Sequence, residues 1–121
     1  MEHLLRRRDF LAAAKAVSIP LPGVLLQARN RSDAGPARIG FTCTKKLGNA
    51  VMRNRIRRRL REAARLVLPG LARPGFDYVL IGRASTENRA FDALKKDIIS
   101  AVSKLHAGPV PGAKPKDASS P

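Results

Sequence analysis

The stretch KKLGNAVMRNRIRRR, residues 45–59, combines dense positive charge with apolar residues at regular spacing. On a helical wheel of 100° per residue, several apolar residues of this stretch and of the following turns fall within about 40° of Ile56. This stripe consists of Met52, Ile56, Leu60, Ala63 and Val67, with Ala64 at its margin. The pattern predicts an amphipathic helix from about Asn49 to Leu68, ended by the Pro-Gly pair that follows. We expect the apolar stripe to face a hydrophobic core.

The other segments predict a small α/β domain around this helix. In ARIGFTCT, residues 37–44, Ile39, Phe41 and Cys43 alternate with small or polar residues, which is typical of a strand. The run DYVLIGR at 77–83 is almost continuously apolar and predicts a buried strand. The remaining expected elements are a helix at 9–17 with an Asp9 cap and an end at SIPLPG, a strand at 24–30, and a helix at about 90–105.

The composition favours a polyanionic partner. The 121 residues carry 24 Lys and Arg against 9 Asp and Glu, a formal net charge of +15. Sixteen of these cations are Arg, whose planar fork binds phosphate in a bidentate manner, so nucleic acid is favoured over a membrane surface. No stretch reads as a secretion signal or reaches the length of a membrane span, so we expect a cytoplasmic protein. We expect one domain at residues 1–106 and a disordered, Pro-rich tail at 107–121.

Residues that could support protein-based catalysis are scarce in this sequence. His3 and His106 lie near opposite ends of the chain, and no two acids stand at helical or strand spacing beside a third ligand. Cys43 is the single cysteine, so the chain alone offers no disulfide and no thiolate metal cage. We therefore expect no catalytic residue and no metal ligand, and a protein that binds rather than cuts.

The cationic helix face favours contact with an RNA backbone. A solvated, salt-bridged face would need acids four residues from its cations, but residues 45–65 hold nine Lys and Arg against the single acid Glu62. The turn KKLGNA adds two Lys and the backbone N–H groups of a helix N-terminus, which suit phosphate. Phe10 and Phe41 could stack on unpaired bases or could belong to the core, and the residues alone leave both alternatives open.

The run RIGFTCTKKLGNAVMRNRIRRRLREAAR, residues 38–65, resembles the signature of the bacterial ribonuclease P protein component. A strand, a K-K-x-G-N-A-V turn and an Arg-Asn-Arg helix follow one another in fixed order, which is far more specific than a basic patch. Weaker resemblance extends over most of residues 6–105, at RRRDF (6–10), DYVLIGR (77–83) and FDALKKDI (91–98).

The resemblance implies an α/β fold, an α+β sandwich in which a small mixed sheet packs with helices, similar to the second domain of a small-subunit ribosomal protein. It implies a left-handed crossover that contains the Arg-rich helix, against the usual right-handed rule. In the family, a catalytic RNA hydrolyses precursor tRNA at the 5′ end of the mature sequence, with Mg²⁺ held mainly by the RNA subunit and substrate. The implied partners are this RNA, in a heterodimer with one RNA subunit, and precursor tRNA, with no membrane.

The resemblance also implies two groups of site residues. Those expected to contact RNA are Lys45, Lys46, Asn49, Arg53, Asn54, Arg55, Arg57, Arg58 and Arg61. Those expected to line a cleft for the 5′ leader, between the sheet and the first helix, are Phe10, Phe41 and Lys45. Family members often carry further aromatic residues at two places that here appear as Ala14 and Leu26. We therefore expect aromatic stacking on the leader to count for less here than backbone contacts by Arg and Lys.

Two other functions stay open at this point. A general RNA-binding or ribosomal protein would bind RNA without stimulating any cleavage. A standalone nuclease would cleave precursor tRNA without added RNA.

Overall fold

The computed structural model describes residues 2–107 of the 121-residue chain. The helices are α1 (Arg7–Ala16), α2 (Ala50–Val67) and α3 (Phe91–His106). The strands are β1 (Glu2–His3), β2 (Val17–Leu21), β3 (Val24–Asn30), β4 (Arg38–Cys43) and β5 (Phe76–Gly82). Three short 3₁₀ helices join them, η1 (Lys45–Leu47), η2 (Leu68–Gly70) and η3 (Ala84–Thr86). The tail expected at 107–121 lies outside the described residues from 108 onward.

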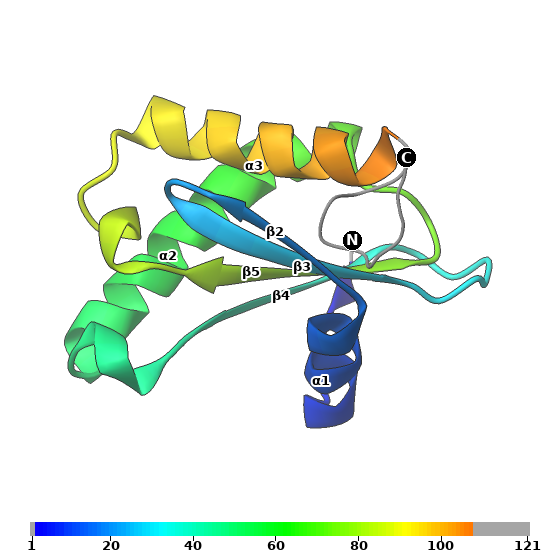
Figure 1. The fold of residues 1–121 in the computed structure, drawn as a ribbon, viewed down its shortest axis with the longest axis horizontal. Helices are drawn as coiled ribbons and strands as arrows, with labels where there is room; N and C mark the ends of the chain where they lie inside the picture. The colour runs from blue at the N-terminus through cyan, green and yellow to red at the C-terminus, as the bar shows by residue number, and fades with distance from the viewer. Residues whose placement is uncertain (1, 108–121) are drawn as a thin grey trace.

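The five strands form one mixed sheet in the order β1-β4-β5-β3-β2. β4 pairs in parallel with both β1 and β5, whereas β3 pairs antiparallel with both β5 and β2. α2 is the crossover between the parallel neighbours β4 and β5. Figure 1 shows α1 below the sheet and α3 above it, with α2 running behind the strands. The expected small mixed sheet packed with helices is confirmed.

The main core lies between the sheet and the pair α2 and α3. Ile56 and Leu60 of α2 are 1% and 0% exposed, and they pack in one cluster with Leu80 of β5 and with Leu94 and Ile98 of α3. The other members of the predicted α2 stripe belong to the same cluster or lie against it. Full burial of each large apolar side chain contributes about 1.5–3 kcal/mol. The stripe read from the sequence is therefore the face that anchors α2 to the sheet.

α1 packs on the opposite face of the sheet through a smaller apolar cluster. Ala13 is fully buried there against Val79 of β5, together with Leu4. The Phe10 ring lies over Gly40 of β4, where a Cβ atom would come within 2.6 Å of the ring carbons. A residue with a side chain at position 40 would therefore push α1 away from the sheet.

The N-terminal third of the chain differs from the sequence-based expectations. The segment SIPLPG was expected only to end a helix, but Val17–Leu21 forms β2, antiparallel to β3. β2 is an edge strand, so Pro20 is tolerated because no further strand needs its missing N–H. The two-residue strand β1 was not predicted at all. Both strands are too short or too interrupted to show a period-two pattern.

The expected Asp9 cap of the first helix is also wrong. α1 begins at Arg7, which places Asp9 in its first turn and not at its N-cap. The Asp9 carboxylate instead lies 3.4 Å from Nη2 of Arg29 and 3.6 Å from Nη2 of Arg38. The Asp9 carboxylate therefore forms ion pairs with residues of β3 and β4 and does not cap α1.

The remaining predicted elements are confirmed. The strands expected at 24–30, 37–44 and 77–83 correspond to β3, β4 and β5, and the two long helices correspond to α2 and α3. Among residues 2–107, no helix is both long enough and apolar enough to cross a membrane.

Candidate nucleic-acid interface

The turn before α2 is shaped by Gly48 and Asn49. Gly48 has a φ of +125°, which residues with a side chain rarely adopt, and a Cβ there would lie 3.1 Å from the Met52 side chain. Oδ1 of Asn49 accepts a hydrogen bond of 3.0 Å from the Met52 N–H and caps α2. The turn thus presents exposed Lys46 beside the helix N-terminus. The side chain of Lys45 lies outside the described part of the structure.

Several arginines on the outward face of α2 are exposed and only loosely held. Arg58 is exposed. Nη1 of Arg55 lies 2.6 Å from Oε2 of Glu87, and Nη2 of Arg65 lies 2.5 Å from Oε2 of Glu62 one turn away. Solvent screens exposed ion pairs of this kind, so they contribute little to stability. These guanidinium groups can therefore exchange a carboxylate for phosphate at little cost.

Other polar groups of α2 make contacts within the protein. Nη1 of Arg59 donates a hydrogen bond of 2.7 Å to the carbonyl oxygen of Glu87, which ties the segment after η3 to α2. Arg57 donates to Oδ1 of Asn54 and to Sγ of Cys43, the latter at 3.7 Å. Glu87 was not foreseen as a partner of α2, because it lies some thirty residues away in the sequence and no local spacing points to it.

Arg53 is half-buried on the flank of α2. Its Nε is buried and has no hydrogen-bond partner among residues 2–107. The RNA-contact residues predicted on α2 therefore divide into exposed groups and groups already engaged by the protein.

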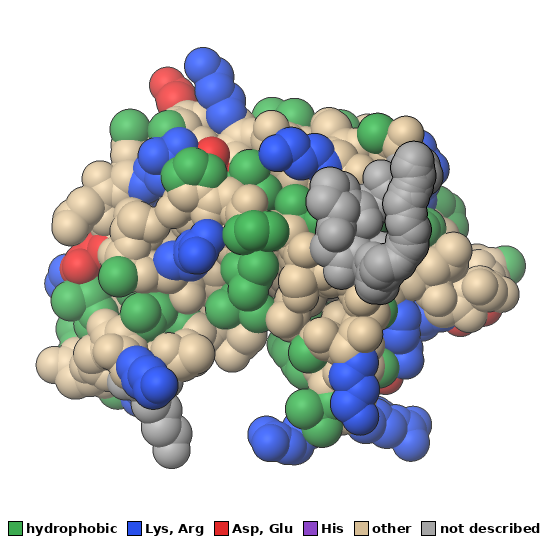
Figure 2. Space-filling view, in the orientation of Figure 1, with side chains coloured by type: hydrophobic (Ala, Val, Ile, Leu, Met, Phe, Trp, Pro, Cys, Tyr) green, Lys and Arg blue, Asp and Glu red, His purple; other side chains and the backbone are tan. Residues whose placement is uncertain are grey.

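A groove of about 470 Å³ lies between α1 and the open part of the sheet. Phe10, Leu11 and Ala14 of α1 form one wall, and Thr42 and Val79 of the sheet form its floor. Its remaining lining residues are Leu5, Arg7, Gln27 and Phe41. Figure 2 shows the molecule hollowed at its lower edge beside α1. The Phe10 ring and the Ala14 side chain thus line the same groove, which is open to solvent.

Phe41 borders this groove, but its ring lies on the other side of the sheet. Because side chains alternate along β4, Phe41 points to the same face as Ile39, and it packs against the α2 and α3 core. The Arg61 guanidinium lies over the Phe41 ring, 5.6 Å from its centroid. Leu26 is likewise fully buried in that core, and its neighbour Gln27 lines the groove instead. Phe10 and Phe41 therefore present their rings to opposite faces.

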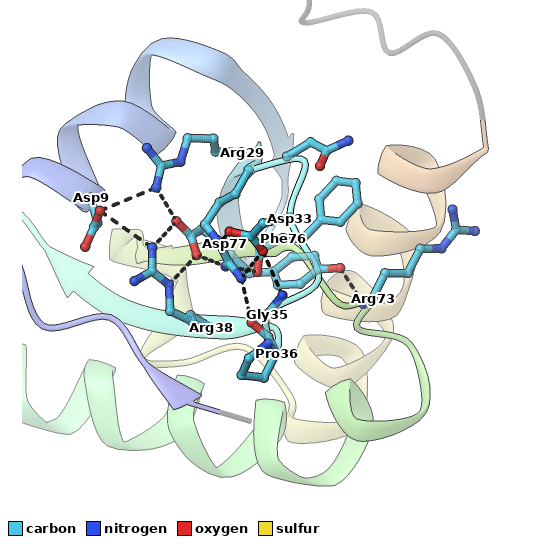
Figure 3. Close-up of polar contacts among 12 residues, drawn as sticks. Asp9, Arg29, Asp33, Gly35, Pro36, Arg38, Arg73, Phe76 and Asp77 are labelled. Atoms are coloured by element: carbon cyan, nitrogen blue, oxygen red, sulfur yellow. Dashed lines mark hydrogen bonds and ion pairs between the residues drawn. The ribbon is translucent and has the colours of Figure 1, made fainter.

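An ionic cluster fixes α1 beside the groove (Figure 3). Asp77 of β5 is fully buried and lies 2.9, 2.5 and 2.7 Å from guanidinium nitrogens of Arg29, Arg31 and Arg38. Burial raises the pKa of the Asp77 carboxyl, but the hydrogen bonds from these arginines outweigh burial and hold the pKa below its usual value. Asp9 of α1 pairs with Arg29 and Arg38 at the edge of the cluster. The cluster joins three strands to α1.

Further cations lie along α1. Arg6, Arg7 and Arg8 are exposed at its N-terminal end, and Lys15 is exposed in its last turn. Figure 2 shows blue side chains around the lower end of the molecule, where α1 lies in Figure 1. Arg7 of this group also lines the groove.

The described residues do not fit a divalent-metal site. Within residues 2–107, no group of three His, Cys, Asp or Glu side chains could hold a metal ion. The most buried carboxylate, Asp77, already accepts hydrogen bonds from three arginines.

The family of the chain follows from comparison with known proteins. A family model described as ribonuclease P matches residues 1–106. The chain belongs to the ribonuclease P protein family. The ribonuclease P protein component of Ruegeria pomeroyi is 59% identical over 108 residues, which cover 86% of each chain. That of Caulobacter vibrioides is 52% identical over 107 residues, covering 88% of this chain and 72% of the relative.

Solved ribonuclease P proteins share the fold. The Thermotoga maritima ribonuclease P protein has a TM-score of 0.70 and 27% identity, covering 84% of this chain and 96% of that one. The Staphylococcus aureus protein has a TM-score of 0.71 at 21% identity, covering 88% and 96% of the two chains, and shows likeness of fold alone.

Family membership confirms the function that the resemblance implied. The chain is a protein subunit of ribonuclease P, the ribonucleoprotein endonuclease, and takes part in removing the 5′ leader of precursor tRNA. Association with the ribonuclease P RNA and with precursor tRNA follows from that membership.

Proposed function

We propose that this ribonuclease P protein uses the two faces of its sheet for two RNA contacts. The basic side of α2 and the turn before it bind the catalytic RNA, and the groove beside α1 holds the 5′ leader of precursor tRNA. The observation that carries the proposal is the placement of exposed arginines on α2 and of an apolar groove with a ring on the opposite face.

The contact with the catalytic RNA is assigned to the cations around α2. The proposed residues are Lys45, Lys46, Asn49, Arg53, Asn54, Arg55, Arg57, Arg58 and Arg61. Within this set, Asn49 acts by capping α2, which fixes the direction of the basic turn. Arg58 and Arg55 act as direct phosphate ligands, because both side chains are exposed and the ion pair of Arg55 with Glu87 can be exchanged for a pair with phosphate.

The contact with the leader is assigned to the groove beside α1. An unpaired base can stack on the Phe10 ring, and the apolar wall of Leu11 and Ala14 accommodates the next one without reading its identity. Exposed Arg7 at the groove edge is placed to meet the leader backbone, and Lys45 is the proposed cation at the turn before α2. Phe41 borders the groove, but its ring faces away, so leader stacking is assigned to Phe10.

The chemistry is assigned to the RNA subunit. The proposal places Mg²⁺ on that RNA and on the substrate, in a heterodimer of one protein and one RNA in the cytoplasm. The shortage of metal-ligand clusters among residues 2–107 supports this division. The protein then acts by binding and orienting precursor tRNA.

A reconstitution assay tests the proposed function. Precursor tRNA is incubated at low Mg²⁺ with the protein alone, with the RNA subunit alone, and with both together. We expect efficient cleavage only with both, because cations that neutralise phosphates replace part of the Mg²⁺ requirement. Cleavage by the protein alone would indicate a standalone nuclease. RNA binding without any stimulation would indicate a general RNA-binding protein.

A further inference from the structure

A second cavity lies on the α2 side of the sheet, away from the leader groove. It has a volume of about 340 Å³. Ile39 of β4, Ala64 of α2 and Leu68 of η2 line its apolar interior, and the Phe41 ring forms a further wall. His3 of the edge strand β1 lies at its border. The cavity is therefore an apolar recess beside a ring at the edge of the sheet.

Two arginines of α2 stand beside this recess. Arg61 lies over the Phe41 ring, and Arg65, four residues further along α2, also lines the recess. Arg65 pairs with Glu62, but the two side chains are 64% and 51% exposed, so this pair is weak and open to exchange. An apolar recess, an aromatic wall and two cations are the features that recognise an unpaired nucleotide, whose base stacks and whose phosphate meets a guanidinium.

We propose that this recess takes one unpaired nucleobase of the ribonuclease P RNA, with the adjoining phosphate bound by Arg61 and Arg65. The proposal rests on the proposed function, because it extends the α2 contact with that RNA. Its volume lies within the range of small-ligand pockets and exceeds what one base requires. The positive charge of Arg61 and Arg65 at the border of the recess favours an anionic nucleotide over an apolar protein segment as its occupant. Its place on the α2 side of the sheet favours the RNA subunit over the leader.

Substitution of Ala64 by Leu tests the proposal without changing any charge. Ala64 is 3% exposed and lines the recess, and Leu is a good helix former, so the added side chain fills the space that the base would take. We expect the dissociation constant for the RNA subunit to rise about tenfold, which is the effect of losing one stacked base. The precursor-to-mature tRNA affinity ratio of the reconstituted enzyme should not change. Ala16→Leu, at an exposed position at the end of α1, is the matched control.

The outcomes separate this inference from the proposed function. Unchanged affinity of a folded Ala64→Leu variant for the RNA subunit, with cleavage still stimulated, overturns the nucleotide site and leaves the proposed function standing. A lower precursor-to-mature ratio with unchanged RNA-subunit affinity assigns the recess to the leader and also overturns the inference.

A titration of the unaltered protein decides the matter if Ala64→Leu fails to fold. Adenosine monophosphate and ribose 5-phosphate are added separately to the full chain, and backbone amide shifts are followed by NMR. We expect adenosine monophosphate to shift the amides of Ile39, Ala64 and Leu68 more than ribose 5-phosphate does, because only the former carries a base. Equal shifts with both compounds, or shifts confined to Thr42 and Val79 in the groove, would overturn the proposal.

Discussion

Arg38 donates two parallel hydrogen bonds to Asp77, from Nε to Oδ1 at 2.7 Å and from Nη2 to Oδ2 at 2.8 Å. This bidentate pair bridges β4 and β5, the parallel strands that α2 connects. Asp77 also accepts hydrogen bonds from Arg29 and Arg31, so its buried charge is fully compensated. The pair therefore holds together the strands that separate the two proposed RNA contacts.

Replacing Asp77 by Asn should destabilise the protein strongly. The variant leaves three arginines around a neutral group, and breaking a buried ion network by removing one partner typically costs about 3–5 kcal/mol. Urea denaturation at neutral pH measures the loss. Asp92→Asn removes an exposed acid on α3 that pairs with Lys95, and should cost less than about 1 kcal/mol. Similar losses in both variants would contradict a structural role of the Asp77 cluster.

The same cluster predicts how stability depends on acid pH. The pKa of Asp77 lies below its usual value of 3.8 in the folded protein, so its ionised form contributes stability above that value. This contribution is lost as the pH falls below 3.8 through the folded-state pKa. Asp33 and Glu62 have lowered pKa values of the same sign, because each accepts hydrogen bonds from an arginine. The unaltered protein should therefore lose more free energy of unfolding between about pH 5 and pH 2 than Asp77→Asn does; equal losses would exclude Asp77 as the cause.

His106 predicts a second dependence, at higher pH. Burial lowers the pKa of His106 below its usual value of 6.5, and the charge of Arg73 lowers it further. Nε2 of His106 lies 2.8 Å from the Tyr78 hydroxyl, which also accepts the backbone N–H of Arg73 at 2.9 Å. The Tyr78 hydroxyl can donate to Nε2 only while that nitrogen carries no proton, so the neutral imidazole favours this hydrogen bond.

Stability should therefore fall as the pH drops from about 7.5 to 5.5, because the unfolded chain takes up a proton that the folded His106 resists. His106→Gln should flatten this dependence in thermal denaturation followed by circular dichroism. His3→Gln, at an exposed position, is the matched control and should leave the dependence in place. A full dependence in His106→Gln would contradict the assignment.

Gly48→Ala should destabilise the turn that leads into α2. The φ of +125° strains any residue with a side chain, and the new Cβ would press on Met52, so we expect a loss of about 1–2 kcal/mol. Gly70→Ala is the control, because an added Cβ at Gly70 meets nothing within 4 Å. Equal denaturation midpoints for the two variants would show that the turn tolerates a side chain.

The sequence predicts the long elements of this fold because their apolar spacing is regular. The α2 stripe around Ile56 has a helical period, and this period depends only on residues within the helix. β2 was not predicted, because the strand is short and contains Pro20, so it shows no alternating pattern. Its pairing with β3 stabilises it, and this pairing cannot be read from the residues of β2 alone. The Asp77 cluster was also missed, because its arginines lie 39–48 residues away and one acid in an apolar run gives no local signal.

The types of residue in the site could be predicted from the sequence, but their partners and positions in space could not. The cations of α2 follow directly from the sequence, but their partners do not, as Glu87 beside Arg55 shows. Phe10 and Phe41 were expected to line one cleft, and both line the groove. Side-chain alternation along β4 turns the Phe41 ring to the face opposite Phe10, which becomes evident only once the helices that cover each face are known.

The division of labour between α2 and the α1 groove is tested most directly by two affinities in the reconstituted enzyme. The affinity for the RNA subunit across a salt series and the precursor-to-mature tRNA affinity ratio are measured for Arg57→Ala with Arg58→Ala, and for Phe10→Leu. The double variant should weaken RNA-subunit binding and reduce the salt slope by about 1 to 2, with the ratio unchanged. Phe10→Leu should lower the ratio and leave RNA-subunit binding unchanged. Lys96→Ala with Lys104→Ala, two exposed cations of α3, controls for net charge. An unchanged salt slope in the arginine double variant, or an unchanged ratio in Phe10→Leu, would contradict the account.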